Sequence, residues 1–473
     1  MVFSSNVFLF LFLPGFLAVY YLTPNRGRLR NWVVLSGSYA FYAWWRLDFV
    51  LLFAAVTLWN YWIGLTIARH GVKTRRARHW MVLGVTVNLL VLGYFKYANF
   101  GVNSLNALLE ATGLQPFQMM HVLLPIGISF YIFESVSYIM DVYRGDAAAT
   151  HHLVDFATFV ALFPHLIAGP VFRYKDLAGQ FLNRSHTVEK FADGSMRFMQ
   201  GFIKKIFIAD TIAPLVTHCF TLHAPTMADA WLGALAYTAQ LYFDFSGYSD
   251  MAIGLGLMMG FRFVENFNQP YVSQSITEFW RRWHMSLSSW LRDYLYFSLG
   301  GNRRGPFNTY RNKFLTMLLG GLWHGANWTF VLWGMWHGTL LCLEQLMGVN
   351  SSPARFRFRR WLPTFMCIVL GWVVFRSATV LTAWHFYRAM FSFDGAGFSD
   401  VYAGDISRMA LATLLLACVV ATFGGAREYR PAIFLLPVRA RPAAVTWLVF
   451  PLFVLAMLKL CAQSYSPFLY FQF

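Results

Sequence analysis

The stretch FLTMLLGGLWHGANWTFVLWGMWHGTLL, residues 314–341, contains no Asp, Glu, Lys or Arg. A helix that crosses the hydrocarbon of a bilayer needs about 20 mostly apolar residues, so this stretch is long enough for a tilted, broken or paired membrane span. Two histidines and an asparagine interrupt it. Polar groups at membrane depth are tolerated only where they face protein or a water-filled cavity. We therefore expect a membrane segment with a functional polar side.

The composition of the whole chain also indicates a membrane protein. Of the 473 residues, 58% are hydrophobic, 19% are aromatic and only 12% are charged, whereas a soluble domain carries about 25% charged residues. No linker or repeat divides the sequence, so we predict one integral membrane domain, residues 1–473. The fold class we predict is all-α and polytopic, with about ten to thirteen transmembrane or re-entrant helices. Candidate spans lie near 7–22, 32–45, 49–68, 81–99, 122–143, 198–220, 230–258, 314–342, 361–375, 409–424 and 445–461, and 156–172 is a candidate re-entrant segment.

The basic residues are distributed as expected for loops of a membrane protein. The net charge is +17, but the cations fall in short clusters between apolar runs, which is the pattern of cytoplasmic loops. Nucleic-acid binding is not expected, because no polar segment interleaves basic and aromatic residues. The clusters are Arg26–Arg30, Arg69–His79, Arg303–Lys313, Arg355–Arg360 and Arg427–Arg441.

The polar residues concentrate in the middle of the chain, and we place the catalytic centre in residues 156–345. His324 lies in GGLWHGAN within the apolar stretch. An imidazole can take a proton from a hydroxyl at neutral pH without carrying a permanent charge in the bilayer, so His324 is the candidate general base. The alternative is a hydrogen-bonded core histidine with no catalytic role.

A second candidate, His284, lies in EFWRRWHMSLSSWLRDYLY, where tryptophans recur at helical spacing. This pattern indicates an amphipathic helix at an interface or a cavity wall. Arg281, Arg282 and Arg292 on the same segment are candidates for binding an anionic donor. The alternative is membrane anchoring by Arg and Trp.

Asp244, Ser246 and Tyr248 form a polar cluster in FDFSGYSDM, for which we expect a cavity-lining or structural role, with substrate or ion binding as the alternative. His337 lies in WGMWHG, too far round an unbroken helix to share a site with His324. No zinc-binding spacing is present, so no metal is expected.

These motifs resemble those of the membrane-bound O-acyltransferase family. The resemblance rests on FPHLIAGPVFR, YFDFSGYSDMAIGLG, EFWRRWHMSLSSWLRDYLY, GGNR and GGLWHGANWTFVLWGMWHG, and the opening MVFSSNVFLFLFLP and the ending SYSPFLYFQF extend it over nearly the whole chain. It is greatest for the bacterial alginate O-acetylase branch. In that family a histidine in an apolar helix is paired with an earlier polar residue, and the match falls on His324 and His284.

The resemblance implies a ring of helices around a central tunnel in the bacterial inner membrane. A cytoplasmic thioester would supply the acetyl groups, and acetyl-CoA is the expected donor. No tightly bound cofactor is expected. The acetyl groups would go to an exported polysaccharide, for which alginate is the preferred candidate. Expected partners are membrane lipid and periplasmic proteins that modify the polymer.

Three alternatives remain open from the sequence. The same chemistry could serve cellulose or peptidoglycan, because the chain shows no polymer-binding domain. A transporter also uses broken membrane helices, although no repeat of two halves is evident. A non-catalytic scaffold of a polysaccharide export complex would require the polar centre to be inert, which is costly in a membrane.

Overall fold

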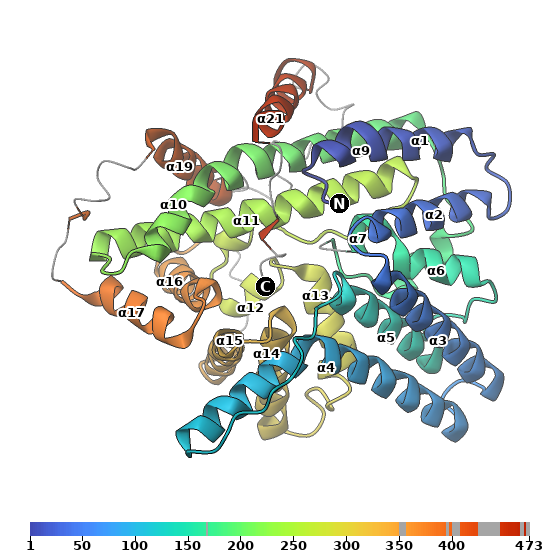
Figure 1. Cartoon of the computed structure of the whole chain (residues 1–473), viewed down its shortest axis with the longest axis horizontal. Coiled ribbons are helices and arrows are strands. Elements are labelled where there is room, and N and C mark those ends of the chain that lie inside the picture. The colour runs from blue at the N-terminus through green and yellow to red at the C-terminus, as the bar shows by residue number, and fades with distance from the viewer. Residues whose placement is uncertain are drawn as a thin grey trace. The chain divides into compact units, whose positions relative to one another are not determined.

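The computed structural model describes residues 1–166, 169–349, 356–393, 397–399, 407–423, 445–463 and 468–469. These residues form helices joined by loops, and no strand is present among them (Figure 1). The predicted all-α class is therefore confirmed for this part of the chain. Two compact units are present, Met1–His186 and Thr187–Phe473. The prediction of one integral domain stays a prediction. The basic cluster Arg427–Arg441 and the first residue of Arg355–Arg360 lie outside the described residues.

The first unit is built on three packed helices, α3, α4 and α5. Asn60 and Asn88 join α3 to α4 inside this group, because each side-chain amide donates to the other's Oδ1, at 3.0 and 2.6 Å. Such interhelical amide pairs satisfy polar groups that lipid cannot. The helices of the unit are α1 Leu13–Leu22, preceded by the π-helical turn Phe8–Phe12, α2 Leu29–Ala43, α3 Asp48–His70, α4 Arg75–Ala111, α5 Ile128–Arg144, α6 Leu153–Ala161, α7 Phe163–Leu166 and α8 Tyr174–Leu177, which the 3₁₀ turn Ala178–Gln180 follows.

The second unit contains the rest of the predicted catalytic segment. Its helices are α9 Val188–Ile203, continued by the π-helical turn Lys204–Ala209 into α10 Asp210–Thr221, α11 Met227–Met258, α12 Ile276–Trp280, α13 Met285–Trp290, α14 Pro306–His324, α15 Trp328–Leu346, α16 Phe358–Arg376, α17 Val380–Phe391, α19 Arg408–Phe423 and α21 Phe450–Gln463. Shorter turns are Pro270–Val272, Leu291–Tyr296 and Val445–Val449.

Helices α9 and α11 lie side by side along most of α9 (Figure 1), and glycines allow their backbones to touch. A Cβ added at Gly201 would lie 2.4 Å from the Gly247 carbonyl oxygen, and one added at Gly247 would lie 2.7 Å from the Gly201 oxygen. Gly194 and Gly254 repeat the arrangement, at 2.6 and 2.5 Å. Small residues at such contacts are the common device for close helix packing in membranes.

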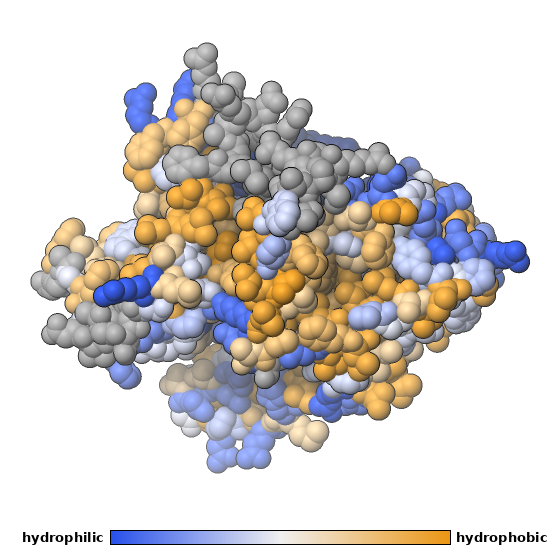
Figure 2. All heavy atoms as spheres, turned by 90° about the horizontal axis from the view of Figure 1, so that it is seen from above, coloured by the Kyte–Doolittle hydropathy of each residue, from blue (hydrophilic) through white to orange (hydrophobic). Residues whose placement is uncertain are grey.

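Three described helices, α3, α4 and α16, are long and apolar enough to cross a membrane by length and composition. Many large apolar side chains outside the cores are exposed, including Leu51 (78%) and Leu90 (67%), and Figure 2 shows apolar side chains gathered into broad surface patches. A surface of this kind suits contact with lipid and not with water. The number of spans and the central tunnel stay predictions.

Candidate active site

The predicted span 314–342 is a helical hairpin and not one helix. Helix α14 ends at His324, and α15 begins at Trp328. Glycines hold the two arms together, since a Cβ at Gly321 would lie 2.3 Å from the Phe330 carbonyl oxygen and one at Gly334 would lie 2.6 Å from that of Met317. Because the chain turns between α14 and α15, His324 and His337 do not lie on one continuous helix. The argument that they must face apart on such a helix therefore no longer applies.

His324 is the last residue of α14 and is 7% exposed. Aromatic rings surround its imidazole, with centroids 5.0 Å away for Trp323, 5.1 Å for Trp333 and 5.3 Å for Phe375. The next residue, Gly325, has no room for a side chain, because a Cβ there would lie 2.1 Å from the Phe330 ring. The local sequence WHGAN therefore ends the helix and leaves a histidine inside an apolar pocket.

His284 lies where the sequence predicted the middle of an amphipathic helix, and the structure differs. Helix α12 ends at Trp280, α13 begins at Met285, and His284 between them has φ +44°. A residue other than glycine rarely adopts this left-handed conformation, and it persists only where the surroundings enforce it. The Met285 amide donates to the Asn266 carbonyl oxygen at 2.9 Å, and the Asn268 amide donates to that of Arg282 at 2.9 Å, so the loop before the 3₁₀ turn Pro270–Val272 enforces the break.

The break brings the two predicted histidines together. The imidazole centroids of His284 and His324 are 6.4 Å apart with an interplanar angle of 57°, and the Trp323 ring contacts both. His284 is fully buried. Its Nδ1 lies 3.1 Å from Asn266 Oδ1, and its Nε2 has no hydrogen-bond partner among the residues that the structure describes.

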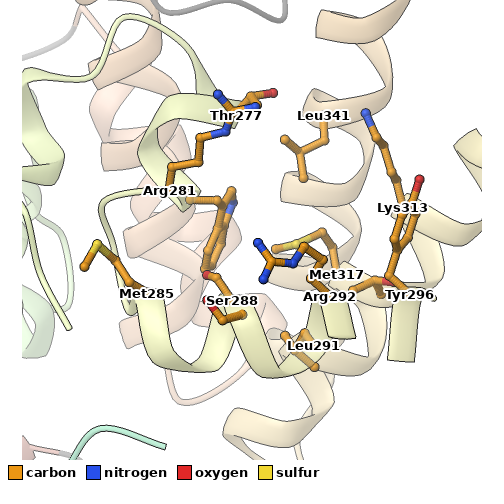
Figure 3. A pocket seen from close by; sticks show the side chains of 13 residues that line it. Thr277, Arg281, Met285, Ser288, Leu291, Arg292, Tyr296, Lys313, Met317 and Leu341 are labelled. Atoms are coloured by element: carbon orange, nitrogen blue, oxygen red, sulfur yellow. The ribbon is translucent and has the colours of Figure 1, made fainter. Parts of the chain in front are cut away.

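A cavity of about 420 Å³ lies within the second unit, and neither His284 nor His324 is among the residues that line it. Three cationic side chains line it, Arg281, Arg292 and Lys313, and Figure 3 shows Arg281 and Lys313 on opposite sides of the space with Arg292 between them. Trp280 and Met285 also line the cavity. Met285 follows His284 in the chain, and the Trp280 ring lies 5.6 Å from Trp333, which in turn contacts His324.

Arg292 has an ion-pair partner in its neighbour Asp293, at 2.7 Å. In the described part of the chain, no carboxylate lies within ion-pair distance of Arg281 or Lys313. Cations that face one cavity attract an anion, and guanidinium and ammonium groups are the usual binders of phosphate. Lys313 was missed as a site residue because its basic cluster, Arg303–Lys313, has the composition of an ordinary loop.

The other predicted binding residues lie outside this cavity. Arg282 is 6% exposed and binds Glu278, with 2.6 Å between Nη2 and Oε1. Asp244 accepts from Lys205 Nζ at 2.7 Å and from the Leu469 amide at 3.0 Å. The Asp244 contacts join α11 to the π-helical turn Lys204–Ala209 and to Leu469, and the expected cavity-lining or structural role stays a prediction.

Ser246 and Tyr248 are buried on α11, 2% and 1% exposed, and the Tyr248 ring packs 4.5 Å from Phe468. His337 is also fully buried, with its ring 4.9 Å from Trp333 and 5.2 Å from Trp280. It packs in the aromatic cluster. Within the described ranges, no group of three or more His, Cys, Asp or Glu residues could hold a metal ion.

Comparison with known proteins decides the family. The model of the membrane-bound O-acyltransferase family matches residues 31–383, which is more than half of the chain. The chain belongs to this family. It is 62% identical, across the full length of both chains, to a probable alginate O-acetylase of Pseudomonas putida. It is also 34% identical to a peptidoglycan O-acetyltransferase of Helicobacter pylori, over 84% of this chain and 80% of that protein.

A more distant relative is a teichoic acid D-alanyltransferase of Bacillus subtilis, 30% identical over 52% of this chain and 65% of that protein. Family membership and the apolar helices confirm the predicted class of a polytopic membrane protein with acyltransferase activity. The roles of the individual site residues remain to be argued from their geometry.

Proposed function

We propose that this acyltransferase transfers acetyl groups for the O-acetylation of an exported polysaccharide, with alginate as the polymer. The observation that carries the proposal is the pair of buried histidines, His284 and His324, whose rings lie 6.4 Å apart. The polymer is inferred from the 62% identity to the probable alginate O-acetylase.

In the proposed reaction His324 is the general base. A hydroxyl is a weak nucleophile until a base assists it, and the aromatic pocket excludes water that would otherwise compete. His324 takes the proton from the acceptor hydroxyl as its oxygen attacks the thioester carbonyl. The carbon–sulfur bond breaks, the carbon–oxygen bond remains as the ester, and the proton passes from His324 to the departing thiolate. His284 orients the hydroxyl.

The donor is a thioester that carries phosphate, with acetyl-CoA as the simplest candidate. Arg281, Arg292 and Lys313 line the cavity where phosphates would bind, and their charges suit a dianion. Trp280 and Trp333 lie between this cavity and His324, so the flexible arm of the donor would pass along these rings to reach the base.

The expected setting is the bacterial inner membrane. The donor would enter from the cytoplasm, and the acetyl group would leave on the periplasmic side, where partner proteins that modify the polymer receive or use it. The apolar surface and the spanning helices α3, α4 and α16 support a membrane location.

The proposal is tested by the acetyl ester content of the exported polysaccharide in cells with wild-type protein, His324→Gln or His337→Gln. His337 is the matched control, because it is a buried histidine of the same aromatic cluster. We expect His324→Gln to lower the ester by at least about 100-fold at normal membrane abundance, and His337→Gln to keep most of it. Wild-type ester in His324→Gln would contradict the mechanism and favour a scaffold. Polymer export that fails together with the ester would favour a transporter.

Peptidoglycan is the second candidate acceptor, because the Helicobacter pylori relative is 34% identical over most of this chain. The same cells separate the two. Ester lost from peptidoglycan, with alginate unchanged, would replace the polymer in the proposal and leave the chemistry intact.

A further inference from the structure

We propose that Asn266 is a positioning residue that fixes the tautomer of His284, so that Nε2 is a hydrogen-bond acceptor. The inference rests on the proposed function for its consequence, but its geometry stands by itself. Asn266 lies in the loop between α11 and α12 and is 1% exposed. Nothing in its sequence spacing connects it with His284.

The donor and acceptor roles follow from the groups around Asn266 Oδ1. It accepts from Ser286 Oγ at 2.8 Å and from the Ser286 amide at 3.4 Å, and His284 Nδ1 lies 3.1 Å away. A backbone amide can only donate, so the Ser286 contacts assign the oxygen of the Asn266 side chain to this position, and Asn266 Nδ2 then has no hydrogen-bond partner among the described residues. A carbonyl oxygen only accepts. Nδ1 of His284 must therefore carry the proton, and the neutral ring has its lone pair on Nε2.

Asn266 also holds the backbone of His284. Its carbonyl oxygen accepts from the Met285 amide at 2.9 Å, while its side chain binds the imidazole. One residue thus fixes both the left-handed turn at φ +44° and the ring. If Asn266 served only to hold the loop, its backbone hydrogen bond to Met285 would be enough.

Aromatic rings restrict the imidazole further. The Phe245 ring lies 4.7 Å away at 90°, and the Phe267 ring lies 6.5 Å away at 24°. Nε2 is buried and has no hydrogen-bond partner in the described ranges. A buried acceptor without a partner is costly, and in the proposed reaction the acceptor hydroxyl donates to this nitrogen.

The tautomer decides what His284 can do in the reaction. A neutral imidazole with an unprotonated Nε2 can receive a hydrogen bond from a hydroxyl, but it cannot donate one to an oxyanion from that nitrogen. The assignment therefore favours orientation of the acceptor hydroxyl over stabilisation of the tetrahedral intermediate. Orientation of the hydroxyl is therefore the role that this tautomer allows for His284.

The tautomer is measured by ¹⁵N NMR of the full-length protein labelled at histidine, with His284→Gln used to assign the signal. We expect a protonated Nδ1 and an unprotonated Nε2 in the wild type and in Asn266→Asp, which keeps an acceptor. Asn266→Leu should lose this signature. Asn268→Leu is the control, because only the backbone of Asn268 makes described hydrogen bonds. A proton on Nε2 in the wild type, or an unchanged tautomer in Asn266→Leu, would overturn the inference.

Activity gives the second readout, with acetyl-CoA and alginate oligosaccharides as probes. Asn266→Leu should lower kcat by about 10- to 100-fold, by analogy with the loss seen when the hydrogen-bond partner of a metal-bound histidine is removed, with little change in KM for acetyl-CoA. In Asn266→Asp the carboxylate stabilises the protonated imidazole. The acidic limb of its rate profile should therefore move to higher pH. Wild-type kcat in Asn266→Leu would contradict the role. A correct tautomer together with an active His324→Gln variant would instead contradict the proposed function alone.

Discussion

The α9–α11 interface and the His284–His324 region both bury polar groups, but their charged groups are placed differently. At the interface, Lys205 Nζ lies 2.6 Å from Asp210 and 2.7 Å from Asp244, and Asp250 accepts from Lys204 at 2.6 Å. In the second region, Nε2 of His284 has no described partner, and Arg281 and Lys313 face a cavity.

The difference teaches how to separate structure from chemistry inside this membrane protein. Burying a charge is costly unless it is paired and hydrogen-bonded. Where each charge has a partner, the polar groups hold helices together. Where cations line a cavity and no carboxylate lies within ion-pair distance among the described residues, as for Arg281 and Lys313, an anionic ligand can bind. On this argument α9–α11 maintains the fold, and the histidine region carries out transfer.

The largest effect on stability should come from breaking one buried ion pair. Lys205→Met leaves the carboxylate of Asp244, 1% exposed, without its cation. We expect the protein to lose about 3–5 kcal/mol and its thermal midpoint in detergent to fall. The double variant Lys205→Met/Asp244→Leu should recover part of the loss, because it removes the orphaned charge. A single variant as stable as the wild type would show that the pair does not hold the fold.

A smaller loss is expected where the helix backbones touch. Gly247→Ala places a Cβ 2.7 Å from the Gly201 carbonyl oxygen and should destabilise the protein by about 1–3 kcal/mol. Gly93→Ala on α4 is the matched control. A Cβ there meets nothing within 4 Å, and alanine favours the helix, so its thermal midpoint should stay constant or rise. Equal midpoints for the two variants would contradict the packing argument.

The smallest effect should appear in the cationic cavity and should concern binding alone. Arg281→Gln or Lys313→Gln should raise KM for acetyl-CoA about 10-fold, which corresponds to about 1.4 kcal/mol, with kcat and the thermal midpoint little changed. Arg303→Gln is the control, because Arg303 is exposed and does not line the cavity. If all three variants gave the same KM, the cavity would not be the donor site.

The helical class has a local signal in the sequence, because apolar runs of sufficient length indicate spans. His324 stands out as a histidine in an apolar segment, whereas His284 lies in a segment with an amphipathic pattern and was paired with His324 through the resemblance to the family. The sequence allowed residues 314–342 to be tilted, broken or paired, but it did not place the turn at residues 325–327, since glycines that pack against Phe330 and Met317 have no signature of their own.

The break at His284 could not be predicted from the chain. Tryptophans at helical spacing favoured one continuous helix, and a positive φ at a histidine comes from tertiary contacts with Asn266. For the same reason Asn266, Ser286 and Lys313 were missed. Their importance depends on which distant residue each one meets in the folded chain.

The central claim is tested most directly by the rate of acetyl transfer per folded molecule in two purified variants, His324→Gln and Lys205→Met. The account predicts that His324→Gln is folded in normal amount and loses transfer by at least about 100-fold. Lys205→Met should yield less folded protein that transfers acetyl at close to the wild-type rate. Normal transfer in folded His324→Gln, together with lost transfer in folded Lys205→Met, would contradict the account. The catalytic role would then belong to the ion pair of Lys205 with Asp244 on α11.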